Sequence, residues 1–556
     1  MSFKRSARHS SSVPSLISKE SVLNAYHYAQ VFGIRNLAER TLGMMMRGYR
    51  YNRYVRTHSV SSEELAVQSS TEFSITPVIS IIVPTFNTPR DYLVQMIESV
   101  ISQSYPHWEL CIADGSPDHD LIESVVKHYQ EKYPSILFRA LEENLGIAGN
   151  TNAALEMATG DYIALLDHDD YLTPDALYEI VSVINDHPEA DVLYTDEDKF
   201  DSSRNRYYDP NFKPDFDPDY LLCCNYITHF YIVRKTIVDQ VQGFSTTMDG
   251  SQDYDFILRT TEKASVVCHI PKVLYHWRIH SNSVAGDPTS KMYAYDAAEH
   301  ALNSHFQRCS IKASASKTAN LGFYRTNYEL QGEPLVSIIM THCDHSLTEK
   351  LLQNMGYDKV EFVSKWSDVK GEYILFLDHI AEVSAESEGS FRYNWLSELV
   401  SNCQRPEIGI VSGKVLSSRE RIYEFGLIYD KGGRIVSPFY HHPTAYPGYY
   451  HLTDSQHCVS VVGGHFLMVG RDDLEQFIRQ EHPHALNECF FYKISLHLGG
   501  KGKRITLLPD ICARLNTEPH RTFLFYTFDP VPDEILNCPQ DPMYNRTLSV
   551  SKPYIL

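Results

Sequence analysis

Three carboxylates lie within four residues at the end of an apolar run. The run spans residues 162–166, and the acids after it are Asp167, Asp169 and Asp170. Carboxylates this close repel one another unless a cation lies among them. Oxygen ligands suit Mg²⁺ or Mn²⁺, which also bridge diphosphates. The spacing therefore predicts a divalent metal here, although an acidic turn that caps the helix expected from Thr173 would use the same residue types.

A second acidic pair opens a stretch with helical periodicity. Asp253 and Asp255 lie in Gly-Ser-Gln-Asp-Tyr-Asp, and the apolar residues 256–258 follow directly. Acids at the start of a helix stabilise its positive end, which is one interpretation of this pair. A carboxylate beside a substrate hydroxyl instead accepts the proton of that hydroxyl. We predict that Asp253 acts as such a general base.

Further polar groups follow other apolar runs. Asp114 ends the run that begins at residue 108, where it can accept a hydrogen bond from a nucleotide base or close an Asx turn. The segment 144–150 carries glycines that let the backbone approach a ligand, although ordinary loops share this composition. Arg278 is a candidate for phosphate binding. His280 or His276 is a candidate metal or phosphate ligand, with a hydrogen-bonded structural histidine as the alternative for each.

The elements that must position these groups alternate between strand and helix. Continuous apolar runs at 79–83, 108–113 and 162–166 are typical of strands buried on both faces. Helical stripes separate them, and Thr173-Pro174 supplies an N-cap and a proline for the first turn. The alternation predicts an α/β fold with a mainly parallel sheet. Such sheets bind ligands outside the carboxyl ends of their strands, which is where the acidic groups fall.

The chain also repeats itself. Residues 334–340 match 77–83, and residues 371–379 match 160–168. The second copy is 46 residues shorter between these landmarks. We therefore predict a second, trimmed domain with the architecture of the first. The predicted parts are a basic helical N-terminal extension and linker at 1–76, a first domain at 77–330, and a second domain with a C-terminal tail at 331–556.

Together and in this order, the motifs resemble those of the family-two inverting glycosyltransferases of the GT-A fold. The similarity is closest to the bacterial tandem-domain type used in O-antigen, capsule and other surface polysaccharide assembly. It implies a Rossmann-like GT-A sheet and a metal-dependent hexosyl- or deoxyhexosyltransferase. The motifs are Pro84-Thr-Phe-Asn, Trp-Glu-Leu-Cys-Ile-Ala-Asp114, Leu-Leu-Asp167-His-Asp-Asp170, Thr195-Asp-Glu-Asp198, Gly-Ser-Gln-Asp253-Tyr-Asp255 and Tyr275-His-Trp-Arg278.

The resemblance implies a role for each matching residue. Asp253 is expected to be the base, and Mn²⁺ or Mg²⁺ is expected on Asp169, Asp170 and His280. Gly115 departs from the pattern, because many relatives have a second Asp there, which leaves the base contact to Asp114. The residues expected to bind the nucleotide sugar are Pro84, Thr85, Phe86, Asp114, Asn144, Gly146, Asn150, Asp167 and Arg278. Those expected on the sugar and acceptor side are Asp196, Glu197, Asp198 and Trp277.

The second copy departs further from the family pattern. Ile380 occupies the expected metal-ligand position after Asp378, and the base motif reads Asn487-Glu488, which keeps one carboxylate of two. The missing 46 residues are expected to include the counterpart of Asp114. We predict that this domain is degenerate and serves structure, acceptor binding or dimerisation. Asp378 and Glu488 leave residual activity open.

Charge and composition limit the partners. The formal net charge of −20 over 556 residues argues against nucleic acid. Residues 1–57 carry a net charge of +8, typical either of contact with an anionic membrane or of a solvated helical extension. The sequence has no apolar run of about 18 residues, so we expect no membrane-spanning helix and no secretory signal. We expect a cytoplasmic protein, with peripheral contact to the inner membrane face and homo-oligomerisation both left open.

The predicted function is transfer of a sugar from a nucleoside-diphosphate sugar to a hydroxyl of a glycan or glycolipid acceptor. A non-catalytic glycan- or nucleotide-binding scaffold with degenerate domains is the alternative. A nucleotidyltransferase would need a Gly-rich basic loop where Pro-Thr-Phe-Asn-Thr-Pro follows the first strand. A glycosidase also uses paired acids, but it does not need the nucleotide-like motifs at the strand ends.

Overall fold

The chain divides into two units. The first comprises Met1–His58 with Leu556, and its described residues, 50–58, are helical. The second, Ser59–Ile555, begins with α3 (Ser62–Ser69), whose capping box joins Ser61 and Glu64, so part of the predicted linker is helical. No described helix is both long and apolar enough to cross a bilayer. The computed structural model describes residues 50–279, 292–344, 346–385, 395–481, 488–517, 525–527, 531–538, 540–550 and 554.

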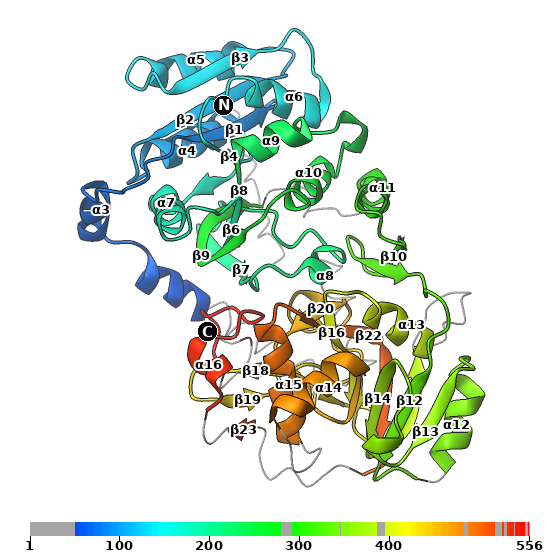
Figure 1. Ribbon diagram of the computed structural model, residues 1–556. Helices are drawn as coiled ribbons and strands as arrows, with labels where there is room; N and C mark the ends of the chain where they lie inside the picture. Colours follow the sequence, from blue (N-terminus) through cyan, green and yellow to red (C-terminus); the bar gives the residue numbers. More distant parts are fainter. Residues whose placement is uncertain are drawn as a thin grey trace, which may run out of the picture. The chain divides into compact units, whose positions relative to one another are not determined.

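The first sheet follows the predicted alternation of strands and helices (Figure 1). Its strands are β1 (Ile79–Thr85), β2 (Trp108–Asp114), β3 (Ile136–Ala140), β4 (Tyr162–Leu165), β5 (Tyr171–Leu172), β6 (Val192–Asp201), β7 (Arg206–Asn211), β8 (Tyr231–Arg234) and β9 (Val267–Arg278). They lie in the order β3-β2-β1-β4-β8-β6-β9-β5, with β7 beside β6. β3, β2, β1 and β4 are parallel, whereas β8 runs antiparallel between β4 and β6. The α/β class is confirmed.

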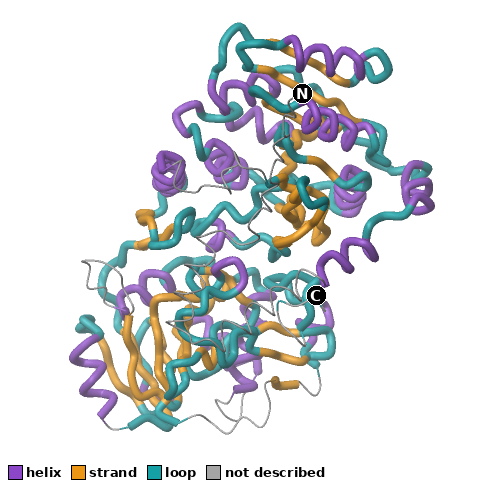
Figure 2. Tube along the Cα trace, turned by 180° about the vertical axis from the view of Figure 1, so that it is seen from behind, coloured by secondary structure: helices purple, strands orange, loops and turns teal. Residues whose placement is uncertain are grey.

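Helices cover both faces of this sheet (Figure 2). They are α4 (Arg90–Ile101), α5 (Asp120–Gln130), α6 (Gly146–Leu155), α7 (Ala176–Asp186), α8 (Pro218–Leu221), α9 (Lys235–Val241), α10 (Gln252–Thr261) and α11 (Met292–Arg308). Ile81 and Val83 of β1 belong to one buried cluster with α4, α5 and α7. Ile82 belongs to the other, with α6, α10 and α11. Burial on both faces explains why β1 is apolar at consecutive positions.

A second sheet follows a two-stranded pair, β10 (Ala313–Lys317) and β11 (Tyr324–Tyr328). Its main strands are β12 (Val336–Thr341), β13 (Val360–Val363), β14 (Tyr373–Asp378), β15 (Ile380–Ala385), β16 (Ile408–Leu416), β21 (Phe466–Gly470) and β22 (Arg504–Leu515). Their order is β13-β12-β14-β21-β16-β22-β15. The remaining strands are β17 (Ile422–Glu424), β18 (Ile428–Tyr429), β19 (Arg434–Val436), β20 (His457–Val459) and β23 (Phe525–Thr527). The helices are α12 (Ser346–Asn354), α13 (Trp395–Cys403), α14 (Arg471–Glu481), α15 (Glu488–Gly500) and α16 (Asp533–Asn537).

The two sheets repeat one another in register. Ile79 of β1 pairs with Tyr162 of β4, and Val336 of β12 pairs with Tyr373 of β14, at the offsets that the sequence repeat gives. A small network is also repeated. Ser80 Oγ donates to Glu109 Oε1 (2.5 Å) and accepts from Gly160 N (2.8 Å). In the second sheet, Ser337 Oγ donates to Glu361 Oε1 (2.6 Å) and accepts from Gly371 N (2.7 Å).

The register also locates most of the missing 46 residues. β13 pairs with β12 as β2 pairs with β1, so the counterpart of β2 is present. The elements without a counterpart between β13 and β14 are α5, β3 and α6, where the chain forms only a short 3-10 helix at Trp366–Asp368. The prediction that Asp114 lost its counterpart by deletion is therefore wrong. β13 ends at Val363, and Trp366 stands where Asp114 would be matched.

The C-terminal residues return to the first sheet. Asn545 Nδ2 lies 3.0 and 2.9 Å from the two carboxylate oxygens of Asp196, and 2.8 Å from Lys213 O. Thr547 Oγ1 donates to Pro271 O at 3.3 Å. The segment predicted as a tail thus completes the packing of the first sheet, because Asp196 and Asn545 are both buried.

Candidate active site

Asp114 ends β2 and is fully buried at the edge where the parallel strands end. Its Oδ1 accepts hydrogen bonds from Thr85 Oγ1 (2.9 Å) and Ser116 Oγ (2.6 Å), and its Oδ2 lies 2.6 Å from His119 Nδ1. This contact with Asp114 is the main reason that the pKa of His119 is raised. Sequence reasoning missed His119, because a single histidine in a loop carries no pattern. Recognition of a nucleotide base by Asp114 stays a prediction.

Gly115 allows the loop after β2 to approach Asn150. A Cβ on Gly115 would lie 2.5 Å from Asn150 Nδ2. Asn150 closes the loop after β3, since its Oδ1 accepts from Leu145 N (3.1 Å) and its Nδ2 donates to Asn144 Oδ1 (3.0 Å). The departure from the family pattern at Gly115 therefore has a packing reason: an acid at this position would displace Asn150.

Large apolar side chains are exposed on the loop that follows β1 and at the start of α6. The exposed fractions are 44% for Phe86, 46% for Leu145 and 45% for Ile147. Gly146 lies between the latter two at a φ of +77°, where a side chain would be strained and a Cβ would meet Asp249. Flat apolar surface beside buried polar groups is suited to stacking against an aromatic ring. These segments contain Phe86, Asn144 and Gly146, which are among the residues predicted to bind the nucleotide sugar.

His229 lies between two carboxylates. Its Nδ1 is 2.8 Å from Glu197 Oε2, and its Nε2 is 3.7 Å from Asp167 Oδ2. Desolvation disfavours the imidazolium, but hydrogen bonds to Asp167 and Glu197 outweigh it and raise the pKa of His229 to about 10. Desolvation also disfavours the ionised form of Asp167, but His229 lowers its pKa. In its imidazolium form, His229 balances the charge of Asp167, and the ring must lose this proton before its nitrogen can bind a metal ion.

The strand order explains how His229 reaches Asp167. β8 runs antiparallel to β4, and Tyr231 pairs with Leu165. The start of β8 therefore lies beside the end of β4, which places His229 next to Asp167. Nothing in the local sequence around residue 229 predicts this, because the pairing of β8 with β4 is a property of the sheet.

Asp170 is fully buried beneath this edge. Its Oδ2 accepts from Tyr275 OH (2.6 Å) and its Oδ1 accepts from Arg278 N (2.7 Å). Desolvation raises the pKa of Asp170 well above its usual range, and the charges of Asp169 and Asp167 raise it further. This concentration of negative charge in a dry environment is what a bound cation relieves.

The residues that come together could hold a divalent cation. Asp167, Asp170 and His229 each offer one ligand atom, and these atoms lie within 4.8 Å of one another. Asp169 is half-buried, and its carbonyl oxygen accepts from Arg278 Nε (2.5 Å). His280, the third predicted ligand, lies outside the described residues. Carboxylate oxygens grouped at one edge of the sheet fit Mg²⁺ or Mn²⁺.

Asp253 faces the same group of charges. It lies in the first turn of α10, and its Oδ2 accepts from Asn225 Nδ2 at 3.1 Å. Desolvation raises the pKa of Asp253, and the charges of His229 and Asp167 act on it with opposite signs. A carboxylate with a raised pKa that neighbours charged groups is a suitable proton acceptor.

Arg278 lies inside the protein. It is fully buried, its Nη2 donates to Gln95 Oε1 (2.7 Å), and its guanidinium lies 4.6 Å from the ring centre of Tyr92. The guanidinium thus supports the backbone of Asp169, and its predicted contact with phosphate has no support in this geometry. Trp277 is half-buried, with its ring centre 5.6 Å from that of His229.

The acidic run 196–198 divides into buried and accessible members. Asp196 is fully buried and lies 2.9 Å from His269, and Asp198 is fully buried and lies 2.6 Å from His276. Acids enclosed in this way hold strands together, so the predicted acceptor contacts of these two are not supported. Glu197 is linked to the site by its contact with His229. Desolvation disfavours its ionised form, but the positive charges of Lys213 and His229 outweigh this effect and lower its pKa to about 2.

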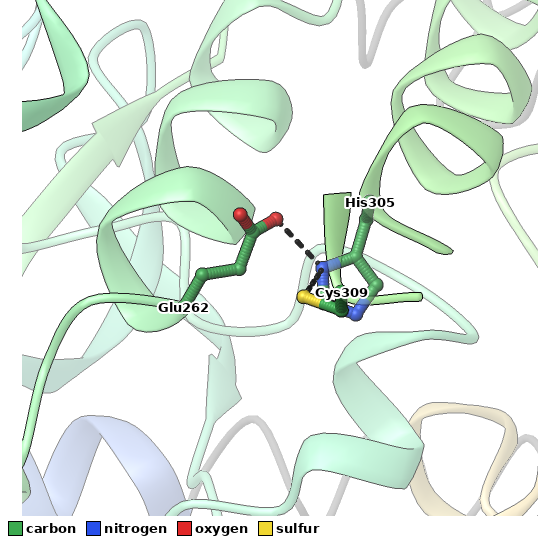
Figure 3. Close-up of side chains that lie close together, drawn as sticks. All are labelled: Glu262, His305 and Cys309. Atoms are coloured by element: carbon green, nitrogen blue, oxygen red, sulfur yellow. Dashed lines mark hydrogen bonds and ion pairs between the residues drawn. The ribbon is translucent and has the colours of Figure 1, made fainter. Parts of the chain in front are cut away.

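A second group of potential metal ligands lies away from this edge. Glu262, His305 and Cys309 come from the ends of α10 and α11, and Figure 3 draws contacts from His305 to both of the others. Arg308 already forms an ion pair with this glutamate, since its Nη2 lies 2.7 Å from Glu262 Oε1. A cation would meet this guanidinium, so the group is better described as an ion-pair cluster that joins two helices.

Residues 80–244 match the model of Glycosyl transferase family 2. An uncharacterized protein, y4gI, of Sinorhizobium fredii is 33% identical over 445 residues, which cover 71% of this chain and 48% of that protein. The O-antigen biosynthesis protein RfbC of Myxococcus xanthus is 29% identical over 422 residues, covering 68% and 32%. This chain thus spans about half, or less, of the length of these two relatives.

Among solved structures, S. aureus TarS 1–349 in complex with UDP is similar at 21% identity. The match covers 41% of this chain and 72% of that chain, with a TM-score of 0.32. A superposition this loose supports no argument about activity.

Proposed function

Because residues 80–244 form a glycosyl transferase family 2 domain, we propose that this chain transfers a sugar from a nucleoside-diphosphate sugar to a hydroxyl of a glycan or glycolipid. We place the acceptor in bacterial surface polysaccharide assembly, as the name of the O-antigen relative suggests. The observation that carries the proposal is the meeting of Asp253 with Asp167 and His229 at one edge of the sheet. This edge joins a proton acceptor to charged groups that can orient an anionic donor.

The donor base would lie against Phe86, Leu145 and Ile147, whose exposed apolar surface supports this placement. Asp167 and Asp170, together with the neighbouring Asp169, would hold Mn²⁺ or Mg²⁺ near the diphosphate. Such an ion would neutralise diphosphate charge and stabilise the departing nucleoside diphosphate.

Asp253 would accept the proton of the acceptor hydroxyl. As its O–H bond breaks, that oxygen forms a bond to the anomeric carbon, and the bond from this carbon to the diphosphate oxygen breaks. Attack from the face opposite the leaving group inverts the anomeric configuration. Asn225 holds the carboxyl in place through its hydrogen bond to Oδ2. Contact of the basic residues 1–57 with a membrane, and assembly into oligomers, stay predictions.

The Asp253→Asn variant tests the proposal. We expect transfer to fall by about 10²–10⁴-fold, while donor affinity measured by calorimetry changes little. Asp120→Asn is a matched control, because Asp120 is an exposed acid in the first turn of α5. If Asp253 only stabilises the start of its helix, the two variants will lose equally little activity, and the assignment of the base is wrong.

A further inference from the structure

The second sheet carries a cluster of two histidines and one aspartate at its own strand ends. His342 follows β12, Asp378 ends β14, and His379 comes next in the chain. Each offers one ligand atom, and these atoms all lie within 4.8 Å of one another. His342 Nδ1 is 2.8 Å from Asp378 Oδ1, and the two imidazole rings stack with centres 4.5 Å apart.

Both histidines adopt a left-handed backbone conformation. The φ angles are 52° at His342 and 58° at His379, a region that costs free energy for residues with a side chain. Asn516 secures both turns, since its backbone N donates to His379 O (2.7 Å) and its Nδ2 donates to His342 O (2.9 Å). A single residue after β22 therefore holds two strained turns so that their imidazoles meet.

The carboxylate of Asp378, beside the stacked rings, is also fixed. Thr341 Oγ1 donates to Asp378 Oδ1 at 2.7 Å, and His465 Nδ1 lies 3.7 Å from Asp378 Oδ2. His465 comes to this position because β21 runs antiparallel to β14, with Phe466 paired to Leu377. This is the arrangement that places His229 beside Asp167 in the first sheet. The second sheet thus keeps the strand ends but carries different ligand types.

The ligand types differ between the two edges in a chemically meaningful way. The first edge offers mainly carboxylate oxygens, which suit Mg²⁺ and Mn²⁺. The second offers two imidazoles and one carboxylate, with Ile380 in place of a further acid. Imidazole nitrogen suits Zn²⁺ and related transition ions, and Zn–N bonds of about 2.0–2.1 Å require ligand atoms closer together than the 4.8 Å limit within which these atoms lie. His342 is 69% exposed, so its ring can move to close this gap.

We propose that His342, Asp378 and His379 bind a transition-metal ion of the Zn²⁺ class, independently of the edge that carries Asp167 and Asp170. Three protein ligands leave a coordination position for water or an anionic ligand. A bound metal ion would explain why both histidines are held in a strained left-handed conformation, which a surface ion pair alone does not require. It does not depend on the proposed sugar transfer, because it lies on the other sheet.

Zinc calorimetry on the full chain, stripped of metal with a chelator, tests the proposal. We expect the wild type to bind one more Zn²⁺ than His379→Ala and His342→Gln, or to bind it at least about tenfold more tightly. Asp169→Asn, on the other edge, should leave this binding intact. Cobalt absorption provides a second readout, with a visible band in the wild type that both histidine variants lose.

His441→Ala is the matched control. His441 is exposed and has a φ of 65°, but it does not belong to the cluster. It should bind zinc as the wild type does. Equal stoichiometry and affinity in the wild type and both cluster variants would overturn the proposal, and so would an equal loss in His441→Ala. Circular dichroism verifies that each variant is folded before titration.

Discussion

The carboxylate of Asp219, on α8 of the first sheet, lies 2.5 Å from Nη2 and 3.1 Å from Nη1 of Arg405, which follows α13 of the second sheet. Thr506 Oγ1 also donates to Asp219, at 2.7 Å. Desolvation opposes ionisation of this acid, but the charges of Arg405 and Arg504 outweigh it and lower its pKa. The two sheets are therefore joined by a buried, fully paired charge.

Asp219→Asn should lower the free energy of unfolding by about 3–5 kcal/mol, because it removes the buried counter-charge of Arg405 and leaves that guanidinium with Glu407 alone. Urea denaturation measures this loss. Glu123→Gln is the control, since Glu123 forms an exposed pair with Lys127 within α5, and removing such a pair costs at most about 0.5 kcal/mol. Similar small losses in both variants would show that the pair does not stabilise the fold.

Gly115→Ala should weaken donor binding, because the new Cβ would lie 2.5 Å from Asn150 Nδ2. Overpacking of this kind costs about 1–3 kcal/mol, and here it would displace the loop that carries Leu145. Calorimetry with UDP-sugars and GDP-sugars measures the effect. Gly499→Ala serves as the control, since its Cβ would meet nothing closer than 4.0 Å. Unchanged affinity in Gly115→Ala would contradict a role for this loop in donor binding.

Metal dependence should follow the carboxylates of the first edge. We expect EDTA to abolish transfer and Mn²⁺ to restore it. In Asp169→Asn, the Mn²⁺ concentration for half-maximal activity should rise at least about tenfold. Activity assayed against Mn²⁺ concentration measures this, with His441→Ala as the unaffected control. An Asp169→Asn enzyme with wild-type metal dependence would remove Asp169 from the proposed ligand set.

His457 should make the protein sensitive to acid. Desolvation lowers its pKa to about 4, whereas the imidazole of an unfolded chain titrates near about 6.5. The folded state binds fewer protons between these values, so stability falls as the pH drops from about 6.5 through 4, by up to about 3 kcal/mol. His457→Gln should remove this loss of stability. Urea denaturation at pH 7 and at about pH 4.5 measures it.

Asp217 and Asp541 change the stability of the fold in the opposite direction over the same pH range. Desolvation raises the pKa of each to about 6, so each favours the folded state below this pH. The quantity to compare is therefore the difference in the free energy of unfolding between His457→Gln and the wild type at each pH. If that difference stays constant, His457 does not titrate on unfolding in this range.

The sequence by itself determined strands β1, β2 and β4 of the first sheet and the acids at the element boundaries. Asp114 and Asp167 follow apolar runs, and Asp253 opens a helical stripe, so local pattern placed each at an element boundary. It also determined the repeat, because Ile79 and Val336 belong to matching runs that pair in the same register. Burial on both faces of a strand imposes a pattern that can be read along the chain.

Only the tertiary structure decided which side chains meet. His229 reaches Asp167 because β8 inserts antiparallel beside β4, and Asn545 reaches Asp196 because the chain end returns to the first sheet. The same holds for Asn516, which fixes His342 from a distant strand. Apolar periodicity records whether a residue is buried, but it does not record which strand becomes its neighbour. The order of strands in a sheet depends on how all the elements pack together, so partners across the sheet leave no local signal in the sequence.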